Sequence, residues 1–171
     1  VIDTLVKEWD NLFISLLVTL KVTVIALLFS LLSGIFFAII ITQFKWMELS
    51  LFPYAIILQV TPIIAIAPLI IILVDDTFVA SLICAWLVSF FPILSSTIIG
   101  LKSTNQGLLD LFKLYRASNI QTLLFLKLPS ALPFIMSGFK ISAGLSLIGA
   151  IVAEFVTGIG GSSSGLAYTI I

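Results

Sequence analysis

Few residues of this 171-residue chain could do chemistry of their own. The sequence contains no His, and its single cysteine, Cys84, stands in an apolar run. A lone cysteine excludes a disulfide within the chain, and without His we expect no metal site. No Gly-rich phosphate loop of the Walker type is present. We therefore expect no catalytic residue, no metal and no cofactor in this chain.

The polar residues that stand out lie in the segment 101–128. Its apolar residues recur at i, i+3, i+4 and i+7, the spacing of one helix face. They are Leu108, Leu111, Phe112 and Tyr115. Asp110, Lys113 and Ala117 occupy a different face, with Arg116 close by. The pattern predicts a short amphipathic helix.

A second short helix is predicted to start at Ser118. Ser118 and Gln121 fit a capping box, in which the Ser oxygen accepts from the backbone and the Gln side chain reaches back. This helix runs to Pro129, a residue favoured in a helix's first turn, so the next long helix is predicted to begin there. Two amphipathic helices joined at a turn form a knob. Its apolar side needs either a partner groove or the membrane surface, and the spacing alone favours neither.

The composition excludes an ordinary soluble domain. Apolar residues make up 61% of the chain, charged residues make up 9%, and the mean hydropathy is +1.31. A soluble domain carries about 25% charged residues because its surface faces water. Lipid must therefore be the solvent for much of this chain. The formal net charge is zero, and no basic run suggests a nucleic-acid partner.

A membrane-crossing helix needs about 20 mostly apolar residues. The stretches that meet this requirement are 12–42, 49–74, 78–100 and 129–156. A further span is expected to start near Ser164. The chain opens on Val1 and ends in an apolar run, so we expect a fragment of a longer protein. Its polar first ten residues do not resemble a cleavable signal peptide.

The basic residues indicate how the chain is oriented. The predicted loops 43–48 and 101–128 share one side because two spans separate them, and they carry five of the eight basic residues. The N-terminal decapeptide and the predicted loop at 75–76 share the other side. They carry five acidic residues and a single basic one, Lys7. Cytoplasmic loops are enriched in Lys and Arg. We therefore expect 101–128 in the cytoplasm and the decapeptide outside.

Two predicted spans carry a small residue at every fourth position, which lets helix backbones approach closely in lipid. These residues are Ala26, Ser30, Gly34 and Ala38 in the first span, and Gly138, Ser142, Ser146 and Ala150 in the last. Such stripes are typical of helix packing. They predict a compact, all-α, polytopic transmembrane bundle.

Polar and helix-breaking residues inside the spans are candidates for a substrate path, because unwound backbone at membrane depth is tolerated where it lines a cavity. Gln59, Thr61 and Pro62 lie near the middle of the second span. Ser89 forms a weaker pair with Pro92 in the third. A plain kink, accommodated by neighbouring helices, explains the prolines equally well.

Glu154 and Lys140 are the charged residues of the last span. At about 1.5 Å per residue, Glu154 lies about 37 Å from Pro129 and so near the outer interface. A gating or docking role and plain solvent exposure are both open for it. Lys140 lies about 16 Å along the same helix, and its stem can reach toward the headgroups as an anchor. If Lys140 instead faces a pore, it suits an anionic substrate.

The segment from Asp110 to Pro129 resembles the EAA loop of ABC importer permeases. That motif runs Glu-Ala-Ala, then Gly, then an apolar residue, Leu and Pro. Asp110 stands at the Glu position, and Arg116 stands where Gly is usual, followed by Ala117 and Ser118. Arg adopts the left-handed backbone less cheaply than Gly. Either the turn sits differently here, or the arginine contacts a partner.

The likeness covers nearly the whole chain and is strongest to the nitrate/sulfonate/taurine-type permeases, through residues 59–62, 91–102 and 151–166. It implies a single type I permease domain over 1–171, in the cell inner membrane, with 101–128 as the cytoplasmic coupling loop. It also implies the residues that meet an ATPase subunit: Asp110, Lys113, Arg116, Ala117, Ser118 and Pro129.

By the same resemblance, the chain is not an enzyme but the membrane subunit of an ATP-driven importer. Its expected cargo is a small solute such as nitrate, a sulfonate, taurine or a thiamine precursor. The expected partners are cytoplasmic ATP-binding subunits that hold the ATP, a second permease copy in a homodimer, and a periplasmic or extracellular substrate-binding protein.

Two other classes of protein are alternatives to an importer subunit. A secondary transporter needs acids or His near the membrane centre to couple ions, and this sequence has no His and no acid centred in a predicted span. A membrane scaffold protein, whose knob binds some other partner, is the second alternative. Neither accounts for the EAA-like segment and the Glu154 region in this order.

Overall fold

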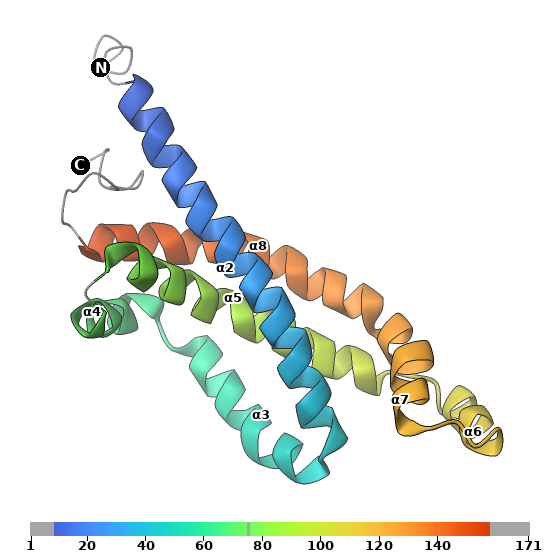
Figure 1. Cartoon of the computed structure of the whole chain (residues 1–171). Coiled ribbons are helices and arrows are strands. Elements are labelled where there is room, and N and C mark those ends of the chain that lie inside the picture. Colours follow the sequence, from blue (N-terminus) through green and yellow to red (C-terminus); the bar gives the residue numbers. More distant parts are fainter. Residues whose placement is uncertain (1–8, 75, 158–171) are drawn as a thin grey trace. The chain divides into compact units, whose positions relative to one another are not determined.

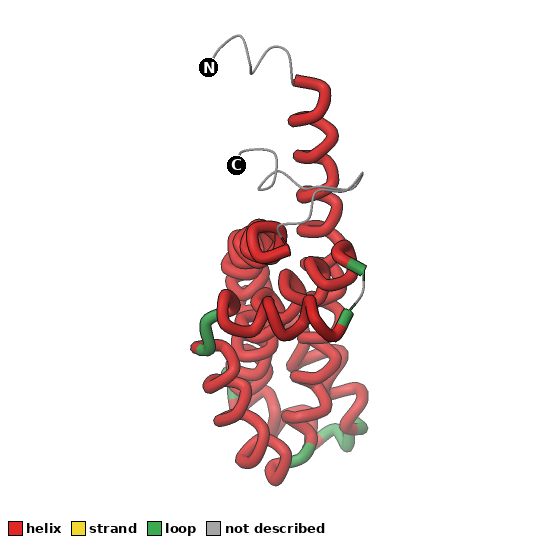
Figure 2. The backbone as a smooth tube through the Cα atoms, turned by 90° about the vertical axis from the view of Figure 1, so that its left-hand side faces the viewer, coloured by secondary structure: helices red, strands yellow, loops and turns green. Residues whose placement is uncertain are grey.

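The computed structural model describes residues 9–74 and 76–157, and the regular elements in that part of the chain are all helices. Figure 2 shows the short loops that separate some of these helices. In chain order (Figure 1) they are α2 (Trp9–Gln43), α3 (Lys45–Val60), α4 (Ile63–Leu73), α5 (Thr77–Lys102), α6 (Gln106–Leu114), α7 (Asn119–Thr122), the π-helical turn η1 (Leu123–Lys127) and α8 (Leu128–Thr157).

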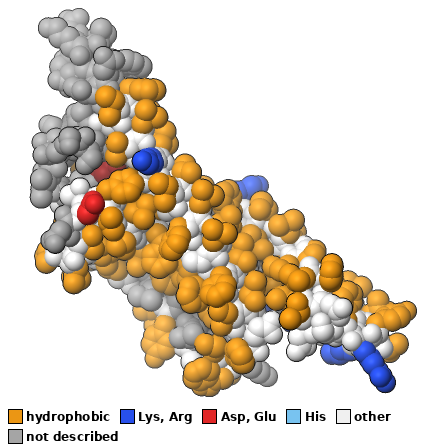
Figure 3. All heavy atoms as spheres, in the orientation of Figure 1, with side chains coloured by type: hydrophobic (Ala, Val, Ile, Leu, Met, Phe, Trp, Pro, Cys, Tyr) orange, Lys and Arg blue, Asp and Glu red, His pale blue; other side chains and the backbone are white. Residues whose placement is uncertain are grey.

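Three of the described helical stretches are long and apolar enough to cross a membrane. They are Leu12–Gln43, Thr77–Lys102 and Asn119–Val156. The spans predicted at 12–42, 78–100 and 129–156 lie within these helices. Hydrophobic side chains cover most of the described surface that faces the viewer in Figure 3. Apolar surface of that extent requires lipid or protein to cover it, so the prediction of an all-α membrane protein is confirmed.

The second predicted span, 49–74, is wrong as one continuous helix. Thr61 and Pro62 separate α3 from α4, and Pro62 is extended, with φ −62° and ψ 120°. The proline ring disfavours a helical backbone at the residue before it, here Thr61. The carbonyl of Pro62 accepts the N–H of Ala65 at 3.0 Å and so opens the first turn of α4. Each of the two resulting helices is shorter than the roughly 20 residues that cross a bilayer.

The predicted loop over 43–48 is also wrong. Phe44 alone separates α2 from α3, and α3 already begins at Lys45. The turn before α5 is present at Asp76, whose Oδ1 accepts the N–H of Phe78 at 2.8 Å. An Asp at this position accepts a hydrogen bond from an N–H that has no partner within the helix, and its negative charge interacts favourably with the positive end of the helix dipole.

Some predictions fall on residues outside the described part of the chain. They concern residues 1–8 of the decapeptide, Asp75, and the further span near Ser164.

The described chain divides into two compact units, and the single-domain prediction stays a prediction. Among the described residues, unit 1 consists of 9–30, 61–74, 76–89 and 143–157, and unit 2 consists of 31–60 and 90–142.

In unit 1, small residues bring α2 and α8 onto α5. One buried cluster consists of Val22, Ala26, Ala85 and Ala150. The hydroxyl oxygens of Ser30 and Ser89 lie 2.6 Å apart. A Cβ added at Gly149 would lie 2.9 Å from the Cα of Ala85, so the backbones of α8 and α5 approach closely here.

Unit 2 repeats this arrangement with glycines. A Cβ at Gly34 of α2 would lie 2.8 Å from Cγ2 of Ile93, and one at Gly138 of α8 would lie 2.8 Å from the Cβ of Ser96. All eight members of the two predicted small-residue stripes are buried. The prediction that the stripes pack helices together is therefore confirmed, with α5 as the helix they contact.

Candidate functional site

The candidate coupling segment begins with a capped helix. Asn105 is the N-cap of α6, and its Oδ1 accepts the N–H of Gly107 at 2.8 Å. Asn is favoured at this position because its side chain satisfies an N–H that has no partner within the helix. Asn105 was missed from the sequence, although an Asn just before a periodic apolar run is itself a helix-start signal.

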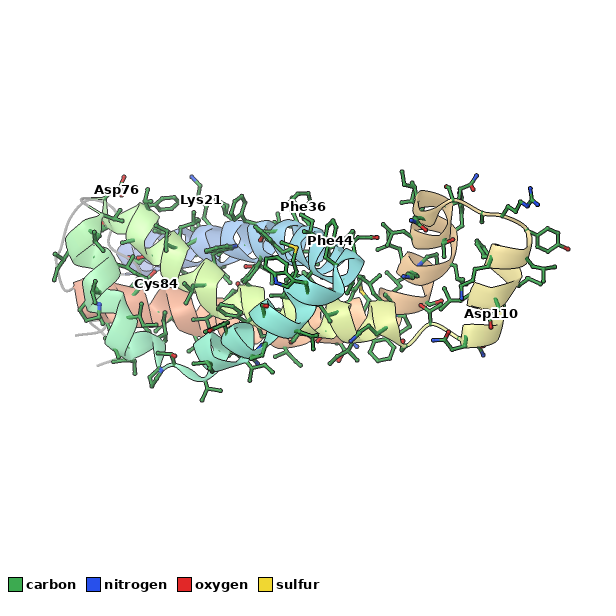
Figure 4. The ribbon with its side chains drawn as sticks, turned by 90° about the horizontal axis from the view of Figure 1, so that it is seen from below. Lys21, Phe36, Phe44, Asp76, Cys84 and Asp110 are labelled. Carbon is green, nitrogen blue, oxygen red and sulfur yellow. The ribbon has the colours of Figure 1, made fainter. Side chains whose placement is uncertain are left out.

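α6 is the predicted amphipathic helix, and none of its residues is buried. Leu108 and Leu111 are 45% and 48% exposed, and Tyr115, just beyond the helix end, is 78% exposed. Figures 1 and 4 place α6 beside α7, and Figure 3 shows basic side chains next to hydrophobic ones at this end of unit 2. Apart from the half-buried Phe112, the apolar face of α6 is thus exposed within the described chain.

Asp110, labelled on α6 in Figure 4, forms an ion pair with Lys113 of the same helix. Nζ of Lys113 lies 2.9 Å from Oδ1 of Asp110, and both side chains are more than half exposed. An exposed pair of this kind contributes only about 0–1 kcal/mol to stability. The pair therefore does little for the fold.

Arg116 ends α6 with a left-handed backbone, at φ 52°. Its N–H donates to the carbonyl of Lys113 at 2.9 Å, and the N–H of Ala117 donates to the carbonyl of Phe112 at 2.9 Å. These two bonds form a Schellman motif, which usually has Gly at the left-handed position. An L-residue other than Gly pays about 1–2 kcal/mol for this backbone. The turn is thus the one Gly would favour, and the expectation of a differently seated turn is wrong.

The predicted capping box at Ser118 is confirmed. The N–H of Gln121 donates to Oγ of Ser118 at 3.2 Å, and the N–H of Ser118 donates to Oε1 of Gln121 at 2.8 Å. The box starts α7 directly after the left-handed turn. Two adjacent local motifs therefore hold the reversal between α6 and α7.

The prediction that a new helix begins at Pro129 needs correction. The chain is helical from Asn119 to Val156 without interruption. In η1 the N–H of Leu128 donates to the carbonyl of Leu123, one residue farther back than in an α-helix. Pro129 has no N–H and its ring crowds the carbonyl four residues earlier. The wider π-helical turn just before Pro129 accommodates it, so α7 is the N-terminal extension of α8.

The residues predicted to line a substrate path have different surroundings. Gln59, Thr61 and Pro62 are exposed, the last two at the break between α3 and α4. Ser89 is fully buried, and its Oγ contacts the carbonyl of Ala85 at 2.7 Å as well as Oγ of Ser30. Ser89 therefore joins helices in unit 1. That these residues line a substrate path stays a prediction.

Glu154 is only 7% exposed, so plain solvent exposure, one of its two open explanations, is wrong. The hydroxyl of Thr19 donates to its Oε1 at 2.8 Å and joins α2 to α8 in unit 1. A buried carboxylate requires such donors, because desolvation without a hydrogen bond is costly. Thr19 was missed from the sequence, since no local signal links residues 135 positions apart.

Two lysines lie within predicted spans. Lys140 is exposed on α8, and its role stays a prediction. Lys21 was not singled out from the sequence, although a cation inside an apolar run is a functional signal. Its Nζ lies 5.9 Å from the ring centroid of Phe78. Phe78 is in the first turn of α5, so Lys21 lies level with that helix end, toward Asp76 (Figure 4).

Comparison with known proteins decides the family. Residues 26–171 match the family model described as "Binding-protein-dependent transport system inner membrane component". The chain belongs to this permease family. Its relatives include a protein named as a nitrate import permease and one named as a putative aliphatic sulfonates transport permease. The predicted family is therefore confirmed, and the chain is part of a multi-pass membrane protein.

Two relatives match most of the chain. It is 34% identical over 154 residues to a probable ABC transporter permease protein of Haemophilus influenzae, which covers 90% of this chain and 61% of the relative. It is 32% identical over 156 residues to the formylaminopyrimidine transport permease protein ThiX of Halalkalibacterium halodurans, covering 91% and 61%. The permease thus spans 61% of the length of these relatives.

A solved structure supports the fold. The structure titled "Crystal structure of an amino acid ABC transporter with histidines" superposes with a TM-score of 0.77 at 20% identity, covering 97% of the permease and 78% of that chain. At this identity the likeness concerns the fold alone. It confirms the predicted type I permease fold.

Proposed function

We propose that the permease is the membrane subunit of an ATP-driven importer for a small solute, and that the α6–α7 turn drives it. One observation carries the proposal. The turn is held by the Schellman bonds around Arg116 and the capping box at Ser118, and the chain then stays helical to Val156. No flexible loop separates the turn from the span, so a displacement of the turn is passed directly to α8.

A cytoplasmic ATP-binding subunit would receive α6 in a surface groove. The exposed face with Leu108 and Leu111 supplies the apolar contact that such a groove buries. Asp110 and Lys113 flank this face on the polar side of the helix. Ala117 has a small side chain at the reversal and allows close approach. ATP would close the two ATP-binding subunits together, and α8 would rock with the turn.

The remaining parts of the assembly follow from this role. Residues 101–128 would lie in the cytoplasm and the N-terminal decapeptide outside, in the cell inner membrane. A second permease copy would complete the pore, and an external binding protein would deliver the solute. The names of the relatives favour nitrate, a sulfonate or a pyrimidine precursor of thiamine as cargo.

Bulk placed at the reversal tests the proposal. In proteoliposomes containing the full-length protein and its ATP-binding subunit, Ala117→Trp is expected to abolish ATP-dependent uptake or to release the ATP-binding subunit. The control is Leu32→Trp, a similar increase in bulk at a residue of α2 that is 70% exposed. Uptake that survives Ala117→Trp unchanged, or that requires an ion gradient instead of ATP, contradicts the proposal.

A further inference from the structure

We propose that Arg116 pairs with a carboxylate on the rim of the groove that receives α6, and so selects the ATP-binding subunit that fits this permease. The inference rests on the proposed function. Arg116 has φ 52°, and it is the one residue other than Gly with a positive φ in the described chain. This backbone costs about 1–2 kcal/mol that Gly would not incur, and a contact made by the arginine side chain would offset that cost.

Within the described chain, no hydrogen bond or ion pair stabilises the arginine side chain. Its side chain is exposed, and no acid among the described residues forms an ion pair with it. The backbone bonds of the turn would form equally well with Gly, because they use only the N–H of Arg116 and of Ala117. The guanidinium therefore adds no hydrogen bond or ion pair to the described part of the chain.

The charges of the segment leave Arg116 uncompensated. Asp110 is the single acid in residues 102–128, and it is already paired with Lys113 at 2.9 Å. The other basic residues of the segment are Lys102 and Lys127. Among the residues that the structure describes, Arg116 thus has no ionic partner.

The neighbours of Arg116 indicate what covers it. Leu114 is 82% exposed and Tyr115 is 78% exposed, directly before it in the chain. A groove that covers these apolar side chains also removes water from the guanidinium beside them. A desolvated arginine requires an anionic partner, and a carboxylate meets its planar donors with two hydrogen bonds.

A carboxylate at that point would discriminate among ATP-binding subunits. A subunit with a neutral or basic rim would leave the guanidinium buried and unpaired, which disfavours the wrong complex. Anionic lipid headgroups are a different partner. They would attract other cations of the segment as well, including the half-buried Lys127, whereas a groove that receives α6 would cover the exposed Arg116 together with Leu114 and Tyr115.

The test measures the affinity of the full-length permease for the ATP-binding subunit that copurifies with it from native membranes. The permease is held in nanodiscs of neutral lipid, and dissociation constants are determined over a range of NaCl concentrations. Arg116→Gly and Arg116→Gln are expected to weaken binding by about tenfold or more and to flatten its salt dependence. Lys127→Gln removes the same charge from the same segment and is expected to change affinity by less than about threefold.

Arg116→Gly is the decisive variant, because it relieves the backbone strain and should nevertheless weaken the complex. Wild-type affinity for both Arg116 variants overturns the inference. If Leu111→Asp still abolishes binding in that case, the proposed function stands and only the role of Arg116 is rejected. If Leu111→Asp also binds normally, the proposed function fails as well. An effect of Arg116 that appears only when anionic lipid is added identifies the lipid as the partner and overturns the inference.

Discussion

The backbone N–H of Ala117 donates to the carbonyl of Phe112 at 2.9 Å, across the left-handed residue Arg116. This bond ends α6 and turns the chain toward α7, so two exposed helices are joined by a defined reversal. The bond depends on the conformation of Arg116, because a right-handed backbone there would carry the chain onward instead of back.

The first prediction concerns the left-handed backbone of the turn. Arg116→Asn should preserve thermal stability in detergent, because Asn tolerates this conformation. Arg116→Val should lower the free energy of unfolding by about 1–3 kcal/mol, because a β-branched residue is strained at positive φ. Thermal unfolding of the two purified variants checks this. Equal melting temperatures would show that the turn has another conformation.

The second prediction concerns the capping box. Ser118→Ala removes the oxygen that accepts the N–H of Gln121, and loss of such a cap costs about 1 kcal/mol. Amide hydrogen exchange should accelerate at the start of α7 and remain unchanged in α5. Ser118→Asp, which can still accept the bond, serves as the control. Unchanged exchange in Ser118→Ala would exclude the box as a support of the turn.

The coupling segment shows how much of the structure local sequence patterns can predict. The helix over Leu108–Tyr115 and the box at Ser118 were predictable because spacing and capping residues lie within a few positions of each other. The left-handed Arg116 was not settled by sequence, because the cost of about 1–2 kcal/mol is small enough for the surrounding bonds to offset. The uninterrupted helix through Pro129 was missed because a π-helical turn leaves no distinct sequence signal.

Contacts between distant residues account for the remaining errors. The small-residue stripes predicted which faces are buried, but they could not identify α5 as the helix they contact. The burial of Glu154 depends on Thr19, 135 positions earlier. The break at Pro62 was foreseeable as a kink, yet whether a proline bends or ends a helix depends on what satisfies the freed backbone groups.

The third prediction compares two glycines of α8. A Cβ at Gly138 would lie 2.8 Å from the Cβ of Ser96 and 3.0 Å from the carbonyl of Pro92, whereas a Cβ at Gly144 meets nothing within 4 Å. Gly138→Ala should therefore destabilise the bundle by about 1–3 kcal/mol through overpacking. Gly144→Ala should stabilise α8 by about 0.5–1 kcal/mol. Thermal unfolding measures both, and destabilisation by Gly144→Ala alone would reverse the assignment of the packed face.

The fourth prediction concerns the buried carboxylate. Thr19→Val keeps the shape of the side chain but removes the donor to Glu154. Leaving a buried acceptor without that bond should cost about 1–3 kcal/mol, measured by thermal unfolding. Glu154→Gln retains an acceptor oxygen for Thr19 and should cost less. If Thr19→Val is as stable as the wild type, the bond between α2 and α8 does not contribute to the fold.

Crosslinking tests the central claim, that α6 contacts an ATP-binding subunit. Cys84, the only cysteine of these 171 residues, is fully buried. The background is the full-length protein in which Cys84 and any cysteine outside these residues are replaced by Ala. In that background, Leu111→Cys places a thiol on the exposed face of α6, and Leu32→Cys places one on an exposed position of α2. A thiol-to-amine crosslinker should capture the ATP-binding subunit from position 111 and not from position 32. Failure to capture it from position 111 in an active complex, or equal capture from both positions, would contradict the claim.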